Sequence, residues 1–119
     1  MDIISTFVKL ETGVDINVTK DVDNTRCYLG KDIAKIICIR KLDTAMRDFM
    51  EEQIIIDDEL FITNHGVYKL FFKYDKPICK IFRKWVLKVL KNIRNTGEYE
   101  VYNLKAEFDE IKMRVYDEL

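Results

Sequence analysis

The strongest structural signal in this chain lies in residues 77–94, which read PICKIFRKWVLKVLKNIR. Apolar side chains recur there at alternating intervals of three and one, as expected for one face of an α-helix. Pro77 suits the first helical turn, and Asn95-Thr96-Gly97 would end the helix, with Gly97 free to take the left-handed C′ conformation. The pattern predicts a long amphipathic helix. Its predicted buried stripe comprises Ile78, Ile81, Phe82, Trp85, Val86, Val89, Leu90 and Ile93.

The opposite face of this helix is strongly basic. Residues 69–94 hold nine of the chain's twenty basic side chains and one acidic one, so their net charge is about +8 (nine minus one) and that of the other residues about −9. No acidic residue stands at helical spacing beside these cations. Such a face is typical of a polyanion-binding protein, although a lysine row is also common on the solvated side of a core helix. The face comprises Lys80, Arg83, Lys84, Lys88, Lys91 and Arg94, and Lys69, Lys73 and Lys76 extend it toward the N-terminus.

Several shorter segments have the patterns of β-strands. Residues 14–19 alternate apolar and polar side chains, and Arg26–Leu29 can return as the second arm of a hairpin. Phe7–Leu10 is a candidate for a short strand beside them. Ile54–Ile56 and Leu60–Ile62, separated by acidic residues, predict two short strands or one bent edge.

Short helices are expected between these strands. One begins at Gly30 and presents its isoleucines at i, i+3 and i+4. A second would be capped by Asp43, and a third, reaching Phe71, by Thr63 or Asn64. Together these elements predict an α+β fold, in which a small antiparallel sheet with an N-terminal hairpin packs against several short helices and one long amphipathic helix.

The charge reverses in the last part of the chain. Residues 98–119 contain seven acidic and three basic side chains. Their apolar positions have the spacing of one more amphipathic helix, too short to be a stable coiled coil by itself. We therefore expect a domain at residues 1–100 and a helix at 101–119 that packs on the domain or on a second copy. The residues of its apolar stripe are Leu104, Phe108, Ile111 and Val115.

The sequence contains no recognisable catalytic or metal-binding motif. Three dispersed cysteines and one histidine, His65, cannot form a usual zinc site, so we expect reduced and mostly buried thiols. His65 has the position of a surface or capping residue. The acidic pairs Glu51-Glu52 and Asp57-Asp58 are interpreted as solvated turns. We expect no signal peptide and no transmembrane segment.

One further observation comes from the ordered combination of short motifs. Cys27-Tyr28-Leu29-Gly30-Lys31-Asp32-Ile33-Ala34 is followed by residues 60–71, LFITNHGVYKLF, then Lys76-Pro77, then Phe82-Arg83-Lys84-Trp85-Val86, and finally residues 93–99, IRNTGEY. This order resembles the Bro-N domain, which is found in the BRO proteins of large DNA viruses and in phage antirepressors. The resemblance covers roughly residues 5–100. The chain departs from the family pattern at Lys91, where a Pro is usual, at Asn64, and at Tyr74-Asp75.

The resemblance implies DNA binding in a viral or phage regulatory role, an α+β fold, and neither enzyme activity, cofactor nor metal. The alternative is a non-enzymatic module that binds a host or viral protein, and a homodimer through Leu104, Phe108, Ile111 and Val115 is a further possibility. The expected compartment is the cytoplasm or nucleus of the host cell. The expected phosphate contacts are Lys80, Arg83, Lys84, Lys88, Lys91, Arg94, Lys73 and Lys76, with Arg26, Lys31 and Arg40 as weaker candidates.

Overall fold

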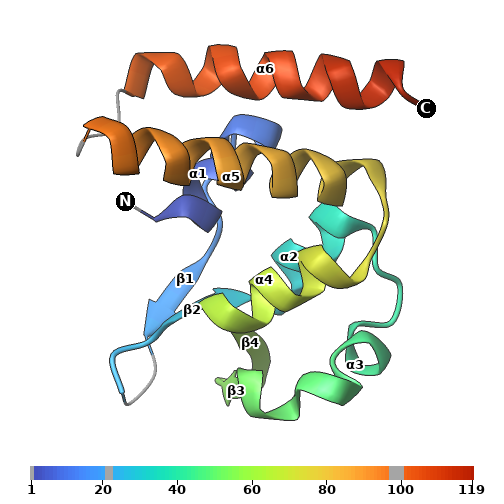
Figure 1. The fold of residues 1–119 in the computed structure, drawn as a ribbon. Helices are drawn as coiled ribbons and strands as arrows, with labels where there is room; N and C mark the ends of the chain where they lie inside the picture. The colour runs from blue at the N-terminus through green and yellow to red at the C-terminus, as the bar shows by residue number, and fades with distance from the viewer. Residues whose placement is uncertain (1, 21–22, 97–100) are drawn as a thin grey trace. The chain divides into compact units, whose positions relative to one another are not determined.

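The chain forms two compact units, Met1–Lys73 (unit 1) and Tyr74–Leu119 (unit 2). The computed structural model describes residues 2–20, 23–96 and 101–119. Unit 1 contains a small sheet and short helices, and unit 2 contains two long helices (Figure 1). The predicted α+β class is therefore confirmed. The predicted domain boundary at residue 100 remains a prediction.

The sheet of unit 1 is antiparallel and has the strand order β1-β2-β4-β3. The predicted hairpin is confirmed, because β1 pairs with β2, but only the end of the stretch 14–19 is a strand. β2 also pairs with β4, where Cys27 lies opposite Thr63. The strands are β1 (Val18–Lys20), β2 (Arg26–Leu29), β3 (Gln53–Ile56) and β4 (Glu59–Thr63).

β3 and β4 form a second hairpin through a two-residue turn. Asp57 and Asp58 both have positive φ, 51° and 64°. Two such residues in a row are the requirement of a type I′ turn, whose twist matches that of the paired strands. The structure thus contains two strands rather than one bent edge, and Asp57-Asp58 is a turn as predicted.

Within its described residues, unit 1 also contains four α-helices. One precedes the strands in the sequence, two lie between β2 and β3 together with a 3₁₀ segment, and one follows the strands. The helix expected at Gly30 is present, and so is the one expected after Thr63 or Asn64. The elements are α1 (Ile3–Thr12), α2 (Gly30–Ile37), α3 (Leu42–Ala45), the 3₁₀ segment η1 (Arg47–Glu52) and α4 (Asn64–Lys73).

The N-terminal segment is a helix, so the strand predicted at Phe7–Leu10 is wrong. Asp2 caps α1, because its carboxylate accepts a hydrogen bond from the backbone N–H of Ser5 over 3.1 Å. Ile4, Phe7 and Val8 are buried at i, i+3 and i+4. The rings of Phe7 and Phe71 pack edge to face with their centres 5.7 Å apart, and this contact links α1 to α4.

The structure shows how three helices of unit 1 begin. The cap predicted at Asp43 is wrong, because α3 begins after Lys41 and Asp43 already lies in its first turn. At α4 the cap is Thr63, whose hydroxyl oxygen accepts the N–H of Gly66 over 3.1 Å. At α2, a Cβ on Gly30 would lie 3.0 Å from the Leu60 carbonyl oxygen and 2.7 Å from a methyl carbon of Leu42, so glycine fits this position without a shift of its neighbours.

Unit 2 is an antiparallel pair of helices, α5 (Pro77–Thr96) and α6 (Val101–Asp117). The long helix predicted from residues 77–94 is confirmed as α5, and the last amphipathic helix as α6. The two helices pack side by side (Figure 1), and Phe108, Ile111 and Val115 of α6 are buried. Gly97 and the side chain of Leu104, for which predictions were made, lie outside the described residues.

Candidate nucleic-acid interface

The basic face lies on α5, whose buried stripe is narrower than its apolar residues suggest. The predicted stripe is confirmed at Ile81, Phe82, Trp85, Val86 and Val89, which are all buried together with Cys79. Leu90 is the exception, with 47% of its surface exposed. Successive helical residues are about 100° apart, so Leu90 lies about 140° around the helix from Trp85 and turns to solvent. Ile78 and Ile93 are half-buried at the borders.

Two cations near the start of α5 have an acidic partner that the helical pattern does not show. Asp75, which precedes the helix, lies 3.1 Å from the Arg83 guanidinium and 3.9 Å from the Lys80 ammonium. Arg83 also donates to the carbonyl of Tyr74 over 2.8 Å, and its side chain is only 24% exposed. Asp75 therefore partly compensates the positive charge at this end of the basic row.

A third cation is engaged by α6. The Lys84 ammonium lies 3.4 Å from the Glu118 carboxylate, and both side chains are largely exposed. An exposed pair of this kind contributes at most about 1 kcal/mol to stability, so a phosphate can displace the carboxylate. Lys84 thus remains available to an anionic ligand.

The C-terminal half of the basic face is different. Within the described residues, no ion pair or hydrogen bond involves the side chains of Lys88, Lys91 or Arg94. Lys91 and Arg94 are exposed, and Lys88 is half-buried. These three cations lie within seven residues of one helix, so their charges add in a small region. Among the described residues, this region has the strongest uncompensated positive charge on α5.

The basic residues of α4 have partners in unit 1. Lys73 donates to the carbonyl of Ala45 over 3.2 Å and lies 4.0 Å from Asp48. The ammonium groups of Lys69 and Lys73 are each 5.4 Å from the centre of the Phe49 ring. Both lysines therefore hold α4 to the 3₁₀ segment η1. Lys76, in unit 2, lies over the ring of Tyr74 at 5.8 Å.

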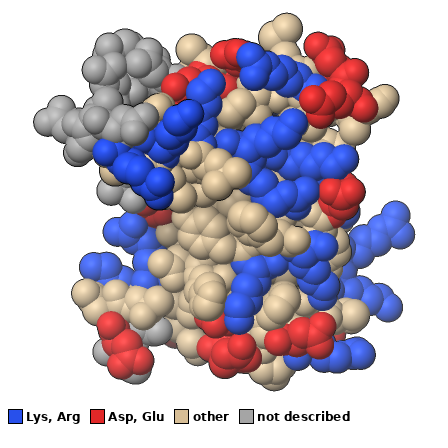
Figure 2. All heavy atoms as spheres, viewed as in Figure 1, with Lys and Arg blue, Asp and Glu red and all other residues tan. Residues whose placement is uncertain are grey.

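The weaker candidates of unit 1 lie apart from this row in the sequence, and two of them form ion pairs. Arg26 contacts Asp2 at 3.1 Å, and Lys31 contacts Glu59 at 3.2 Å. Arg40 is exposed. Figure 2 shows one face of the molecule, on which Lys and Arg side chains lie where α5 is drawn and also where unit 1 is drawn, with Asp and Glu side chains among them.

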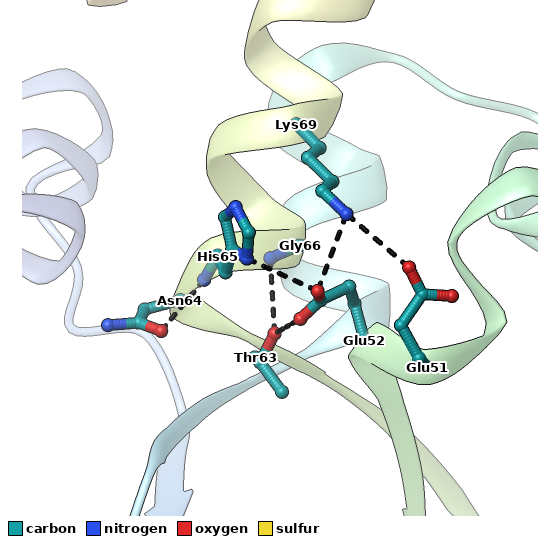
Figure 3. A network of polar contacts seen from close by, with 7 residues as sticks. All are labelled: Glu51, Glu52, Thr63, Asn64, His65, Gly66 and Lys69. Atoms are coloured by element: carbon teal, nitrogen blue, oxygen red, sulfur yellow. Dashed lines mark hydrogen bonds and ion pairs between the residues drawn. The ribbon is translucent and has the colours of Figure 1, made fainter.

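A second polar cluster surrounds Glu52 (Figure 3). Thr63 donates its hydroxyl hydrogen to Glu52 Oε2 over 2.5 Å and accepts the Gly66 N–H. Glu52 Oε1 lies 3.2 Å from His65 Nδ1 and 3.4 Å from Lys69 Nζ. The interpretation of Glu51-Glu52 as a solvated pair is therefore wrong for Glu52, whose side chain is 13% exposed, and holds for Glu51, at 65%.

The Glu52 cluster depends on a close approach at the start of α4. A Cβ on Gly66 would lie 2.8 Å from the Glu52 Cβ and 2.7 Å from a methyl carbon of Ile62, so this position requires glycine. The hydrogen bond from Thr63 lowers the pKa of Glu52; burial acts against this, while Lys69 and His65 add to it. The cluster joins η1, β4 and α4, and His65 remains a surface residue, 68% exposed. Sequence patterns missed it because its members come from three elements.

The cysteines are free thiols, as expected. Cys27 and Cys79 are buried and Cys38 is exposed. Burial raises the pKa of Cys79. In the part of the chain that the structure describes, no group of His, Cys, Asp or Glu side chains could hold a metal ion. Over the same residues, no helix has the length and apolar composition needed to cross a membrane.

The sequence of the chain matches a known domain family. The chain matches the model of the BRO family, N-terminal domain (Bro-N), over residues 15–92, which is more than half of its 119 residues. The chain therefore belongs to the Bro-N family. The match begins in unit 1 and ends in α5, and so includes most of the basic face. No curated protein and no solved structure matches the chain significantly.

Proposed function

We propose that this chain is a DNA-binding regulatory domain of a virus, which acts without catalysing a reaction. The observation that carries the proposal is the cluster of Lys88, Lys91 and Arg94, which have no acidic partner within the described residues of a chain whose overall charge is −1. Membership of the Bro-N family supports it, because the family resemblance implies DNA binding. Such a domain would act in the cytoplasm or nucleus of the host cell.

The proposed contacts are to DNA phosphates. Lys88, Lys91 and Arg94 would bind directly, and Lys84 would exchange Glu118 for a phosphate. Lys80 and Arg83 would need to leave Asp75, and Lys73 and Lys76 remain secondary candidates because both already have partners in the chain. Because each neutralised phosphate releases counterions, three to four contacts predict that log K falls with log salt with a slope of about −3 to −4.

A salt titration with a charge-reversed variant tests this proposal. Lys88→Glu/Lys91→Glu should bind duplex DNA of any sequence more weakly, with a salt slope shallower by about two. The matched control is Lys9→Glu/Lys105→Glu, which makes the same change in charge at two exposed lysines, one on α1 and one on α6. The control should bind like the wild type. Equal loss in both variants would mean that only net charge matters, and wild-type affinity in the first variant would refute the assignment of the site.

A second candidate function is a protein-interaction module. It is favoured by two large apolar side chains that α6 exposes beside its acidic residues, Met113 at 67% and Tyr116 at 50%. An apolar surface with an acidic rim suits a basic protein partner. A titration at physiological salt separates the two functions, because micromolar, salt-sensitive DNA binding is expected only of the first.

A further inference from the structure

The exposed face of α5 contains leucines as well as cations. Leu87 is 67% exposed and Leu90 is 47% exposed. A single exposed leucine is ordinary on a protein surface. These two are three residues apart, and so are neighbours on the helix surface. They therefore form a small apolar patch on the face that carries the proposed phosphate contacts.

Cations flank this patch along the helix. Lys84, Leu87, Lys91 and Arg94 follow one another at intervals of three, four and three, so they lie along one stripe of the helix. Leu87 is therefore placed between Lys84 and Lys91, and Leu90 lies within one turn of Arg94. Any ligand that contacts Lys84 and Lys91 together must also approach Leu87.

The dimensions of the patch suit a duplex. From Lys84 to Arg94 the helix rises by about 15 Å, and the major groove of B-DNA, about 12 Å wide, admits an α-helix. Cations on the helix then reach phosphates at the edges of the groove, while the side chains between them face the bases. The apolar group on the floor of that groove is the thymine methyl, which apolar side chains contact.

We infer that Leu87 and Leu90 contact thymine methyl groups in the major groove while the cations around them bind phosphates. The inference rests on the proposed function and adds a preference for thymine to it. The charge pattern favours DNA over a lipid surface, because a helix that lies in a membrane interface needs a broad apolar face, and the exposed apolar patch here is two leucines flanked by cations.

The test compares two duplexes of the same sequence, one containing thymine and the other containing uracil in place of every thymine. The two duplexes differ only in the methyl groups. Wild-type protein should bind the thymine duplex more tightly, by about fourfold for each methyl group that a leucine buries. Leu87→Gln/Leu90→Gln should bind both duplexes equally while keeping the wild-type salt slope. Both leucines are exposed, so this variant should fold normally, which a thermal melt verifies.

The matched control is Met113→Gln/Tyr116→Gln, which removes two apolar side chains of similar exposure from α6. It should retain the preference for thymine. If the wild type binds both duplexes equally but with salt dependence, or if the leucine variant keeps the preference, the inference is wrong and the proposed function stands. If neither duplex binds, the proposed function fails as well. Leucine-dependent binding to anionic phosphatidylserine vesicles without a thymine preference would assign the face to a membrane and overturn the inference.

Discussion

The phenolic hydroxyl of Tyr28 donates a hydrogen bond of 2.6 Å to the carboxylate of Asp2. The same carboxylate caps α1 through the N–H of Ser5 and forms an ion pair with Arg26 at 3.1 Å. Tyr28 is buried, with 1% of its surface exposed, so its hydroxyl requires this acceptor. The Asp2 side chain thus caps α1 and also links this helix to β2.

Replacing this carboxylate should destabilise unit 1. In Asp2→Asn the charge is removed and the hydrogen bonds lose their ionic character, so we expect unfolding free energy at pH 7 to fall by about 1–2 kcal/mol. Tyr28→Phe is the companion variant, since it removes one hydrogen bond and leaves the cap and the ion pair. Urea denaturation measures both. An unchanged stability in Asp2→Asn would show that the carboxylate has no net role.

The same contact predicts a dependence on pH. Burial alone would raise the pKa of Asp2, but the hydrogen bonds from Ser5 and Tyr28 and the charge of Arg26 outweigh it, and the pKa is lowered. A carboxylate with a lowered pKa in the folded state stabilises the protein above its unfolded pKa of about 3.9, and this contribution is lost as the pH falls through the folded pKa. The stability difference between wild type and Asp2→Asn should therefore shrink between pH 7 and pH 3. If the stability difference stayed constant over that range, it would contradict a lowered pKa of Asp2 in the folded state.

A helix or strand can be predicted from the sequence where its own residues form a long and regular pattern. α5 was predictable because its helical period continues over eighteen residues. α1 was not, because its ten residues include the β-branched Ile3, Ile4, Thr6 and Val8, which also favour strands. Its clearest helical signals are Asp2 as a cap and Gly13 after the last turn, and both lie outside Phe7–Leu10, the segment for which a strand is predicted.

The basic face was predictable as a row of cations, but its charge balance was not. Glu118 is 34 residues from Lys84 in the sequence and reaches it only because α6 folds back along α5. Leu90 is exposed because the buried stripe of α5 is narrow. The apolar pattern of the sequence predicts Leu90 as buried because it does not show the width of that stripe. Tertiary contacts therefore decided which cations remain uncompensated.

A second stability prediction concerns Glu52. Glu52→Gln removes the negative charge that accepts the Thr63 hydroxyl and contacts His65 and Lys69. We therefore expect the unfolding free energy at pH 7 to fall by about 1 kcal/mol. Glu51→Gln is the control, because its exposed carboxylate contacts only the Lys69 ammonium at 3.4 Å among the contacts described. It should change stability by less than about 0.5 kcal/mol. Thermal melts compare the two, and equal losses would mean that the cluster is no more than surface charge.

A gain in DNA affinity is predicted for Asp75→Asn. Removing this charge releases Lys80 and Arg83 from their acidic partner and removes repulsion of nearby phosphates. Affinity should therefore rise, and the salt slope should steepen by up to about two. Asp109→Asn is the matched control, since Asp109 is an exposed acidic residue paired with Lys105 on α6. If both variants gain equally in a fluorescence titration, the effect is one of net charge and not of this contact.

The last prediction concerns the packing of α6. Phe108 is 1% exposed, and α6 packs along α5 in the same chain, so Phe108→Ala should leave a cavity and cost about 3–5 kcal/mol. Phe108→Leu is a milder change that can be measured if the alanine variant does not fold. Met113→Ala, at a 67% exposed site of the same helix, is the control and should change stability little. Because the contacts are within one chain, the melting temperature of each variant should not depend on protein concentration. A wild-type melting temperature that rises with concentration, together with a folded monomeric Phe108→Ala in light scattering, would instead show that Phe108, Ile111 and Val115 join two copies.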